Sequence, residues 1–267
     1  MTLVELFSYK FMLHAVLAGL LTSITAGVLG YFVIIRNYTF SAHAISHIGI
    51  PGATGAVWLG VSPLFGLVSF CTLGGLLIGL LGKKASTREV ATGSILAFGI
   101  ALGLYFALLS SKASKTMQSV LFGNILAIDN TSLWLFFAVT ILVAVTMIVI
   151  GRPLLFASIT PVVAQAKCVR VKLLNMIFIL VLSFAVTMSI QVVGTLLVFA
   201  LLITPTSTAI NLAARPVVVI ILSIAVSWSC VILGILASAV LDIPPSFAIV
   251  LFSIAFWLLS KLKNNIL

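Results

Sequence analysis

Acidic residues are nearly absent from this sequence: Asp and Glu together number 4 in 267 residues, and all charged residues amount to 7%. Hydrophobic residues reach 63%. A water-soluble domain of this length could not keep that balance without exposing large apolar patches, so the class of soluble globular proteins is excluded. The solvent for most of this chain is lipid.

Sequence motifs of nucleotide-binding and hydrolytic sites are missing too. The chain contains no GxxxxGK[ST] loop, so it cannot bind ATP by a P-loop, and it contains neither HExxH nor GxSxG. Asp and Glu occur only at the ends of apolar runs, which excludes a buried carboxylate relay and paired intramembrane carboxylates. We predict that the chain is not an enzyme and that energy for its work comes from another protein.

Cysteine is scarce, and the charge is of one sign. Cys71, Cys168 and Cys230 are odd in number, widely separated and never arranged as CxxC, so neither a disulfide framework nor a thiolate metal site is predicted. The net charge of +10 comes from Lys and Arg at the ends of apolar runs, not from a basic face with stacked aromatic rings. Nucleic acid is therefore not an expected partner.

Long apolar runs with short polar breaks fill the chain instead. A helix needs about 20 residues to cross the hydrocarbon core, and these runs are continuously apolar, which excludes the alternating strands of a β-barrel. We predict an all-α, polytopic transmembrane bundle of eight to nine spans, forming a single domain over residues 1–267. The nine expected helices are 11–35, 45–61, 64–82, 90–109, 132–151, 173–191, 193–211, 216–240 and 246–260. The first is expected to stay as a membrane helix, because it exceeds a signal-peptide core and has no clear cleavage site.

The positions of Lys and Arg predict how the spans are oriented, because short loops rich in these residues stay in the cytoplasm. With nine spans and an outer N-terminus, most basic residues fall on the cytoplasmic side. That set is Arg36, Lys83, Lys84, Arg88, Arg152, Lys167, Arg170, Lys172, Arg215, Lys261 and Lys263, against Lys10, Lys112 and Lys115 outside. We expect the N-terminus outside and the C-terminus in the cytoplasm.

Small residues spaced four apart predict close helix packing, which in lipid depends on near approach of backbones. Four such stripes occur: Ala15, Gly19, Ser23 and Gly27; Gly52, Ala56 and Gly60; Gly75 and Gly79; and Gly99 and Gly103. Together they favour a tightly packed bundle over a chance excess of glycine.

Two histidines stand at the start of the second expected span. On a helix, His43 and His47 share one face about 6 Å apart along the axis, close enough to ligate one metal ion. Ionisable groups in a span usually face a cavity or one another. The alternative is that both rings lie near headgroups and bind backbone carbonyls. Pro51 and Gly52, one turn further on, are expected to kink the helix and give it room to move.

The longest cytoplasmic loop, 151–172, contains a helix start. Thr160 is a suitable N-cap and Pro161 fits the first helical position, so a short helix is expected within about 158–168. Such a helix offers a docking surface for a soluble partner. A turn lying on anionic lipid, held by the basic residues of the loop, is equally compatible with the sequence.

A proline within an apolar span marks the segment 194–209. Pro205 frees a backbone carbonyl. The neighbouring hydroxyls, including that of Thr204, either satisfy this carbonyl or line a polar path for a substrate.

At these residues the chain resembles the metal-type family of ABC importer permeases, whose members move zinc, manganese or iron. The resemblance covers nearly the whole chain. Its marks are the Arg36 region, AHAISHIGIPG at 42–52, VLFGNIL at 120–126, VGTLLVFALLITP at 193–205 and DIPP at 242–245.

The resemblance implies a type II ABC importer permease in a bacterial inner membrane that works as a homodimer. It implies three further partners: a cytoplasmic ATPase dimer, an extracytoplasmic metal-binding solute-binding protein, and the surrounding lipid bilayer. No permanently bound cofactor is implied; the metal is the transported substrate. Residues that map to the ATPase-coupling segment are Ser158, Thr160, Pro161, Ala164 and Lys167.

The chain departs from the family pattern at the metal path. The family's second helix carries Asp and His, which map to His43 and His47, so an imidazole stands where a carboxylate is usual. Manganese prefers carboxylate oxygen, whereas imidazole suits zinc and other borderline-soft ions, so this exchange is expected to bias the path toward zinc, nickel or copper, with zinc the expected cargo. In the coupling segment Thr160 replaces a usual Asp and Cys168 a usual Gly. The alternative function is a secondary carrier or channel for metal cations that needs no ATPase.

Overall fold

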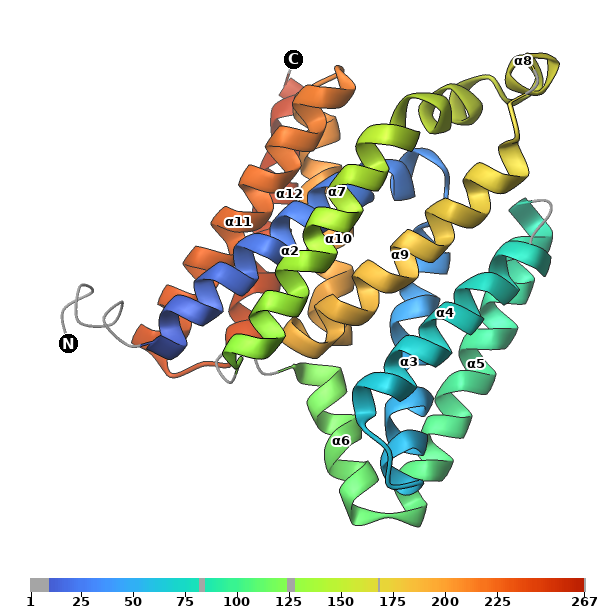
Figure 1. Cartoon of the computed structure of the whole chain (residues 1–267). Helices are drawn as coiled ribbons and strands as arrows, with labels where there is room; N and C mark the ends of the chain where they lie inside the picture. The colour runs from blue at the N-terminus through green and yellow to red at the C-terminus, as the bar shows by residue number, and fades with distance from the viewer. Residues whose placement is uncertain (1–9, 82–84, 124–127, 168, 267) are drawn as a thin grey trace.

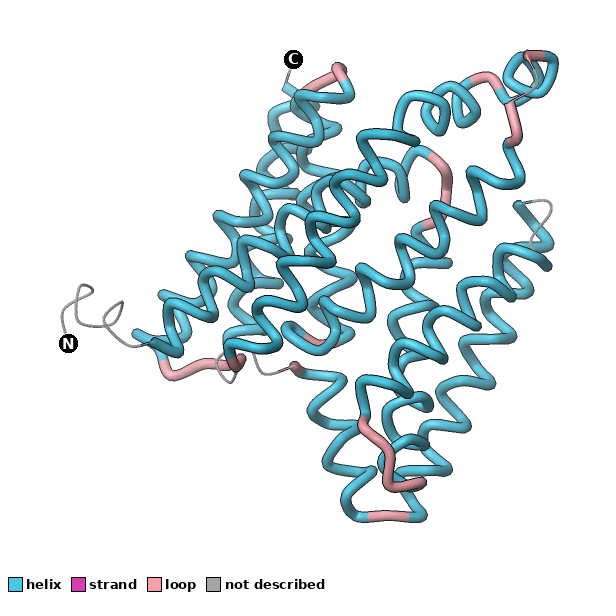
Figure 2. The backbone as a smooth tube through the Cα atoms, viewed as in Figure 1, coloured by secondary structure: helices cyan, strands magenta, loops and turns pink. Residues whose placement is uncertain are grey.

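Eleven α-helices and no strand make up the part of the chain that the computed structural model describes, residues 10–81, 85–123, 128–167 and 169–266. The helices follow one another through short loops (Figures 1 and 2). They are α2 (Lys10–Ile35), α3 (Thr39–Trp58), α4 (Pro63–Leu81), α5 (Ala85–Leu109), α6 (Ser111–Phe122), α7 (Asn130–Ile159), α8 (Pro161–Ala166), α9 (Val171–Val193), α10 (Thr195–Leu212), α11 (Pro216–Leu241) and α12 (Pro245–Ile266).

The nine long helices correspond in order to the nine predicted spans, so the all-α fold with eight to nine spans is confirmed. Eight of them are long and apolar enough to cross a membrane among the residues described. The ninth, α3, is less apolar but lies inside the bundle, packed against α4, α5, α6, α9 and α10. A helix enclosed by protein has no lipid-facing side to keep apolar, which is why its polar residues are tolerated.

The short helix α6 was not predicted, because only apolar runs were sought and this segment is amphipathic. It packs on α3 and α5. Figure 1 shows α6 at one end of the bundle and α8 at the other, with α2 beginning at the α6 end and α12 ending at the α8 end. The chain thus crosses the bundle an odd number of times, as nine spans require.

Close approach of glycines to neighbouring helices confirms the predicted tight packing. A Cβ on Gly19 would lie 2.4 Å from a Val231 side-chain carbon, and one on Gly27 would lie 2.5 Å from a carbon of Ile224, so this stripe packs α2 directly on α11. The prediction that Gly60 packs against a neighbouring helix is wrong. Gly60 lies in the turn after α3, and nothing lies within 4 Å of its Cβ position. It ends the helix rather than packing it.

Two loops that are 71 positions apart in sequence meet at Gly123 and Gly194. Both residues have positive φ, 68° and 86°, with ψ of 177° and 158°, a combination that only glycine adopts readily. A Cβ on Gly123 would lie 2.2 Å from the carbonyl carbon of Val193, and one on Gly194 would lie 2.4 Å from the nitrogen of Gly123. Here the ends of α6 and α9 touch backbone to backbone.

Candidate functional site

His43 and His47 lie side by side on α3, as their spacing of four predicted. Their ring centroids are 4.5 Å apart with an interplanar angle of 72°. The His43 ring also packs on Phe199 of α10, at 4.6 Å between centroids. Both histidines are half-buried in the single chain, whereas most of the other α3 side chains between them and Ala56 are buried. The imidazole pair is therefore held by protein on one side and open on the other.

One nitrogen of this pair lacks a partner. The Nδ1 atom of His43 is buried, and no hydrogen-bond partner for it lies among the described residues. A buried polar atom without a partner costs about 1–3 kcal/mol, and a metal ion is one way to satisfy an imidazole nitrogen. The described chain also contains no group of three or more His, Cys, Asp or Glu side chains that could hold a metal. Within this described part of the chain the candidate site therefore consists of two imidazoles, and their role as metal ligands stays a prediction.

Pro51 and Gly52 lie about one turn beyond His47, inside α3, which continues to Trp58. A Cβ on Gly52 would lie 2.2 Å from the carbonyl oxygen of Gly66, so α3 and α4 cross there at backbone contact. On another side of α3, a Cβ on Gly103 of α5 would lie 3.2 Å from the Pro51 nitrogen. The role of Pro51 as a moving kink stays a prediction. Glycines on α4 and α5 pack closely against this segment from two sides.

Thr204 and Pro205 lie on α10, the helix whose Phe199 touches His43. Pro205 is buried and Thr204 is half-buried. The hydroxyls that follow are bonded locally: Thr206 Oγ1 lies 3.0 Å from the Leu202 carbonyl and 2.6 Å from Ser223 Oγ, and Thr208 donates to the Thr204 carbonyl at 2.9 Å. The hydroxyls around Pro205 therefore tie α10 to itself and to α11. A role of Thr204 in a polar path remains a prediction.

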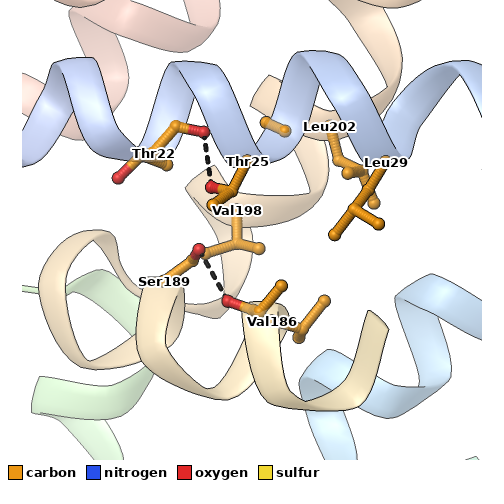
Figure 3. Close-up of a pocket in the computed structure, with 9 residues that line it drawn as sticks. Thr22, Thr25, Leu29, Val186, Ser189, Val198 and Leu202 are labelled. Atoms are coloured by element: carbon orange, nitrogen blue, oxygen red, sulfur yellow. Dashed lines mark hydrogen bonds between the residues drawn. The ribbon is translucent and has the colours of Figure 1, made fainter. Parts of the chain in front are cut away.

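A small cavity between α2, α9 and α10 does not add to the site. It holds about 10 Å³, roughly the space of one water molecule. Figure 3 shows its hydroxyls turned back to their own helices: Thr25 donates to the Thr22 carbonyl at 2.9 Å, and Ser189 donates to the Ala185 carbonyl at 2.8 Å. With these donors satisfied and apolar side chains completing the wall, the cavity offers no ligand set for a cation.

The short helix α8 begins at Pro161, as predicted, and projects from one corner of the bundle (Figure 1). Its first backbone bond runs from Ala164 N to the Thr160 carbonyl, 3.0 Å. The prediction that the Thr160 side chain caps α8 is wrong. Its hydroxyl donates back to the Phe156 carbonyl of α7 at 3.3 Å. The Thr160 side chain thus closes α7 rather than opening α8.

The other predicted coupling residues divide between α7 and α8. Ser158 belongs to the last turn of α7 and Ala164 is fully buried on α8. Lys167 lies 5.9 Å from the Phe156 ring centroid, in cation–π contact. Residue 168 lies outside the described residues. Val162 and Ile159 are 79% and 67% exposed, so apolar side chains at this corner point away from the protein.

A cluster around Arg36 joins this corner to the histidine helix, and sequence reasoning noted Arg36 only as a topology and family mark. Arg36 Nη1 donates to the Ser158 hydroxyl at 3.2 Å, and Nη2 donates to the side-chain oxygen of Asn175. The guanidinium carbon lies 5.6 Å from the Tyr38 ring centroid and 5.5 Å from that of Phe178. Burial lowers the pKa of Arg36 from its ordinary value, yet an arginine stays charged at any physiological pH.

Comparison with known proteins places the chain in a family. Residues 8–264 match the model of the ABC 3 transport family. The manganese transport system membrane protein MntC of Halalkalibacterium halodurans is 32% identical over 263 residues, covering 96% of this chain and 90% of the relative. The manganese import system permease protein ScaB of Streptococcus parasanguinis is 32% identical over 253 residues, covering 94% and 90%.

A solved structure has the same fold. The structure described as PsaBC from Streptococcus pneumoniae in complex with Fab superposes with a TM-score of 0.86, at 26% identity, and the match covers 97% of this chain and 95% of that chain. The chain belongs to the ABC 3 transport family. It is a multi-pass membrane permease of an ABC transport system and not an enzyme, as the missing P-loop and catalytic motifs predicted.

Proposed function

We propose that this chain is the permease subunit of an ABC importer for a divalent transition metal, with zinc preferred over manganese. The observation that carries the proposal is the pair of adjacent imidazoles on α3, one of them with an unpartnered buried nitrogen. Membership in the ABC 3 transport family supports an ATPase-driven permease over the alternative of a carrier that needs no ATPase.

The preference for zinc rests on the donor atoms. The relatives above are named for manganese, a metal that favours carboxylate and water oxygen, whereas imidazole nitrogen suits zinc, copper and nickel. By the resemblance noted in the sequence, His43 stands where the family pattern has Asp, and the described residues contain no group of three or more His, Cys, Asp or Glu side chains that could hold a metal. The family therefore supports metal import, and the residue at position 43 supports a different choice of metal.

A homodimer would complete the site. Two copies that face each other across their half-buried histidines would bring four imidazoles together, and four nitrogen ligands fit the tetrahedral geometry that zinc takes. The single chain, with two ligands, could hold a cation only weakly. We therefore place the metal path between the two copies.

The metal preference is tested by uptake. In cells lacking their other zinc and manganese importers, we expect the wild-type protein, expressed with its own ATPase and binding protein, to accumulate zinc more readily than manganese or iron. His43→Asp restores the family's carboxylate and is expected to raise the manganese-to-zinc uptake ratio. Equal ratios in wild type and His43→Asp would contradict the proposed selectivity while leaving metal import intact.

The helix α8 is proposed as the docking site for the cytoplasmic ATPase dimer. Its support is the exposed apolar pair Val162 and Ile159 at a corner that projects from the bundle. If α8 faces the cytoplasm, the C-terminus at the same end of the bundle would be cytoplasmic and the N-terminus would lie outside, in a bacterial inner membrane. An extracytoplasmic solute-binding protein would then deliver metal at the α6 end.

Val162→Asp is expected to prevent stable assembly with the ATPase, because it puts a charge on an apolar contact. The ATPase should no longer co-purify with the permease, and metal uptake should fall to background. Val217→Asp is the control, since Val217 is 66% exposed and lies at the start of α11, away from α8. Normal co-purification with Val162→Asp would favour the other interpretation, in which α8 lies on lipid.

A further inference from the structure

We propose that Arg36 is a positioning residue that transmits movement of α8 to the histidine helix α3. The inference rests on the proposed function, in that it takes α8 as the ATPase contact and His43 and His47 as the metal path. It assigns to Arg36 a role in coupling, without any contact to metal or to the ATPase.

The Arg36 guanidinium binds the two helices that flank α8. On α7, Nη1 lies 3.2 Å from Ser158 Oγ and 3.5 Å from the Leu154 carbonyl oxygen. On α9, Nη2 donates to the Asn175 side-chain oxygen. Because α8 is connected to α7 at Thr160 and to α9 by the loop before Val171, a displaced α8 pulls on both of the helix ends that Arg36 holds.

The same residue is tied to the start of α3. Arg36 is two positions before Tyr38, which is the residue that caps α3 and whose carbonyl accepts the first helical bond from Ala42 N at 2.8 Å. The Tyr38 ring is buried and packs edge-on against Phe178 of α9, with centroids 5.8 Å apart. From Tyr38 to His43 is about 7.5 Å of helix, so a shift of the α3 start is passed to the imidazoles.

A second arginine fixes the turn between Arg36 and α3. Arg88 of α5 donates from Nη2 to the Asn37 carbonyl at 2.9 Å, and its guanidinium carbon lies 4.2 Å from the Tyr38 ring centroid. Asn37 has a φ of 55°, in the left-handed region. The turn is therefore held from two sides and behaves as a rigid connection rather than a flexible linker.

The guanidinium is needed for its shape as well as its charge. Arg36 reaches acceptors on two helices and at the same time faces two aromatic rings, which a planar fork with several donors allows and a lysine ammonium does not. Arg36→Lys keeps the positive charge at the membrane boundary and loses the bridge. It therefore separates a coupling role from a role in membrane insertion.

The test measures metal transported per ATP hydrolysed by the permease–ATPase complex in proteoliposomes, with zinc as the probe. We expect Arg36→Lys to keep ATP hydrolysis near the wild-type rate and to lower the zinc-to-ATP ratio about tenfold, within the range of coupling between distant sites. Arg215→Lys is the matched control, since Arg215 is an exposed residue before α11 and should keep the wild-type ratio.

Two milder variants keep the charge in place. Asn175→Ala and Ser158→Ala each remove one acceptor, and each is expected to lower the ratio by less than Arg36→Lys does. Combining Asn175→Ala with Arg36→Lys should add little, because both break the same link. The proposal would be overturned if the two substitutions lowered the zinc-to-ATP ratio additively. It would also be overturned if Arg36→Lys lowered ATP hydrolysis and zinc uptake in parallel at an unchanged ratio, which would leave Arg36 as a structural residue. Absence of zinc uptake by the wild-type complex would instead refute the proposed cargo.

Discussion

Replacing His43 or His47 by alanine is expected to abolish metal-dependent growth and reduce metal uptake to background, while the protein still inserts in the membrane. Among the residues that the structure describes, the proposed site consists of this imidazole pair, so one substitution would remove half of the ligands proposed for each copy. Loss of even an outer-shell partner lowers metal affinity by about 10–100-fold, and loss of a direct ligand should do more. The measurement is uptake of zinc and manganese into cells that depend on this importer.

The third histidine provides the control. His14 lies on α2, and its Nδ1 atom is 3.0 Å from the carbonyl oxygen of Ile128, far along the chain from α3. His14→Ala removes one hydrogen bond and should leave uptake near the wild-type rate. Wild-type uptake by both His43→Ala and His47→Ala would show that α3 does not line the metal path.

Replacing Gly123 or Gly194 by alanine is expected to prevent most of the protein molecules from folding. Each residue has a backbone conformation that costs a non-glycine residue about 1–3 kcal/mol. In addition, the new methyl group would meet backbone atoms of the opposing loop at 2.2 to 2.4 Å, and backbone atoms cannot rotate away as a side chain can. Strain and overlap act together at a single junction.

The yield of monodisperse protein in detergent and its thermal unfolding midpoint measure this effect. Gly93→Ala is the control, because Gly93 is helical and a Cβ there would have its nearest contact at 3.8 Å, with a ring carbon of Phe40. That variant should be recovered like the wild type. Normal yield and stability of Gly123→Ala and Gly194→Ala would mean that the two loops separate easily and do not hold α6 to α9.

Much of the fold follows from local features of the sequence. The long apolar runs predicted nine helices, all of which are present, and Pro161 predicted the start of α8. Spacing alone brought His43 and His47 together, because residues four apart share a helix face. Helix ends were less well predicted: α3 begins at Thr39 rather than near residue 45, so both histidines lie within the helix. The error arose because the spans were predicted from apolar runs, and the first turns of α3 are less apolar than the rest of that helix.

The sequence by itself determined that this chain is a membrane protein, is built of helices, carries an imidazole pair on one of them and contains no P-loop motif. The tertiary structure alone decided that Gly123 meets Gly194, that Phe199 packs on His43 and that Arg36 bridges α7 and α9. The physical reason is that lipid-facing and helix-facing surfaces are both apolar in a membrane, so hydrophobic periodicity does not show which helices are neighbours. Shape complementarity between distant segments selects those contacts, and it exists only once the chain has folded.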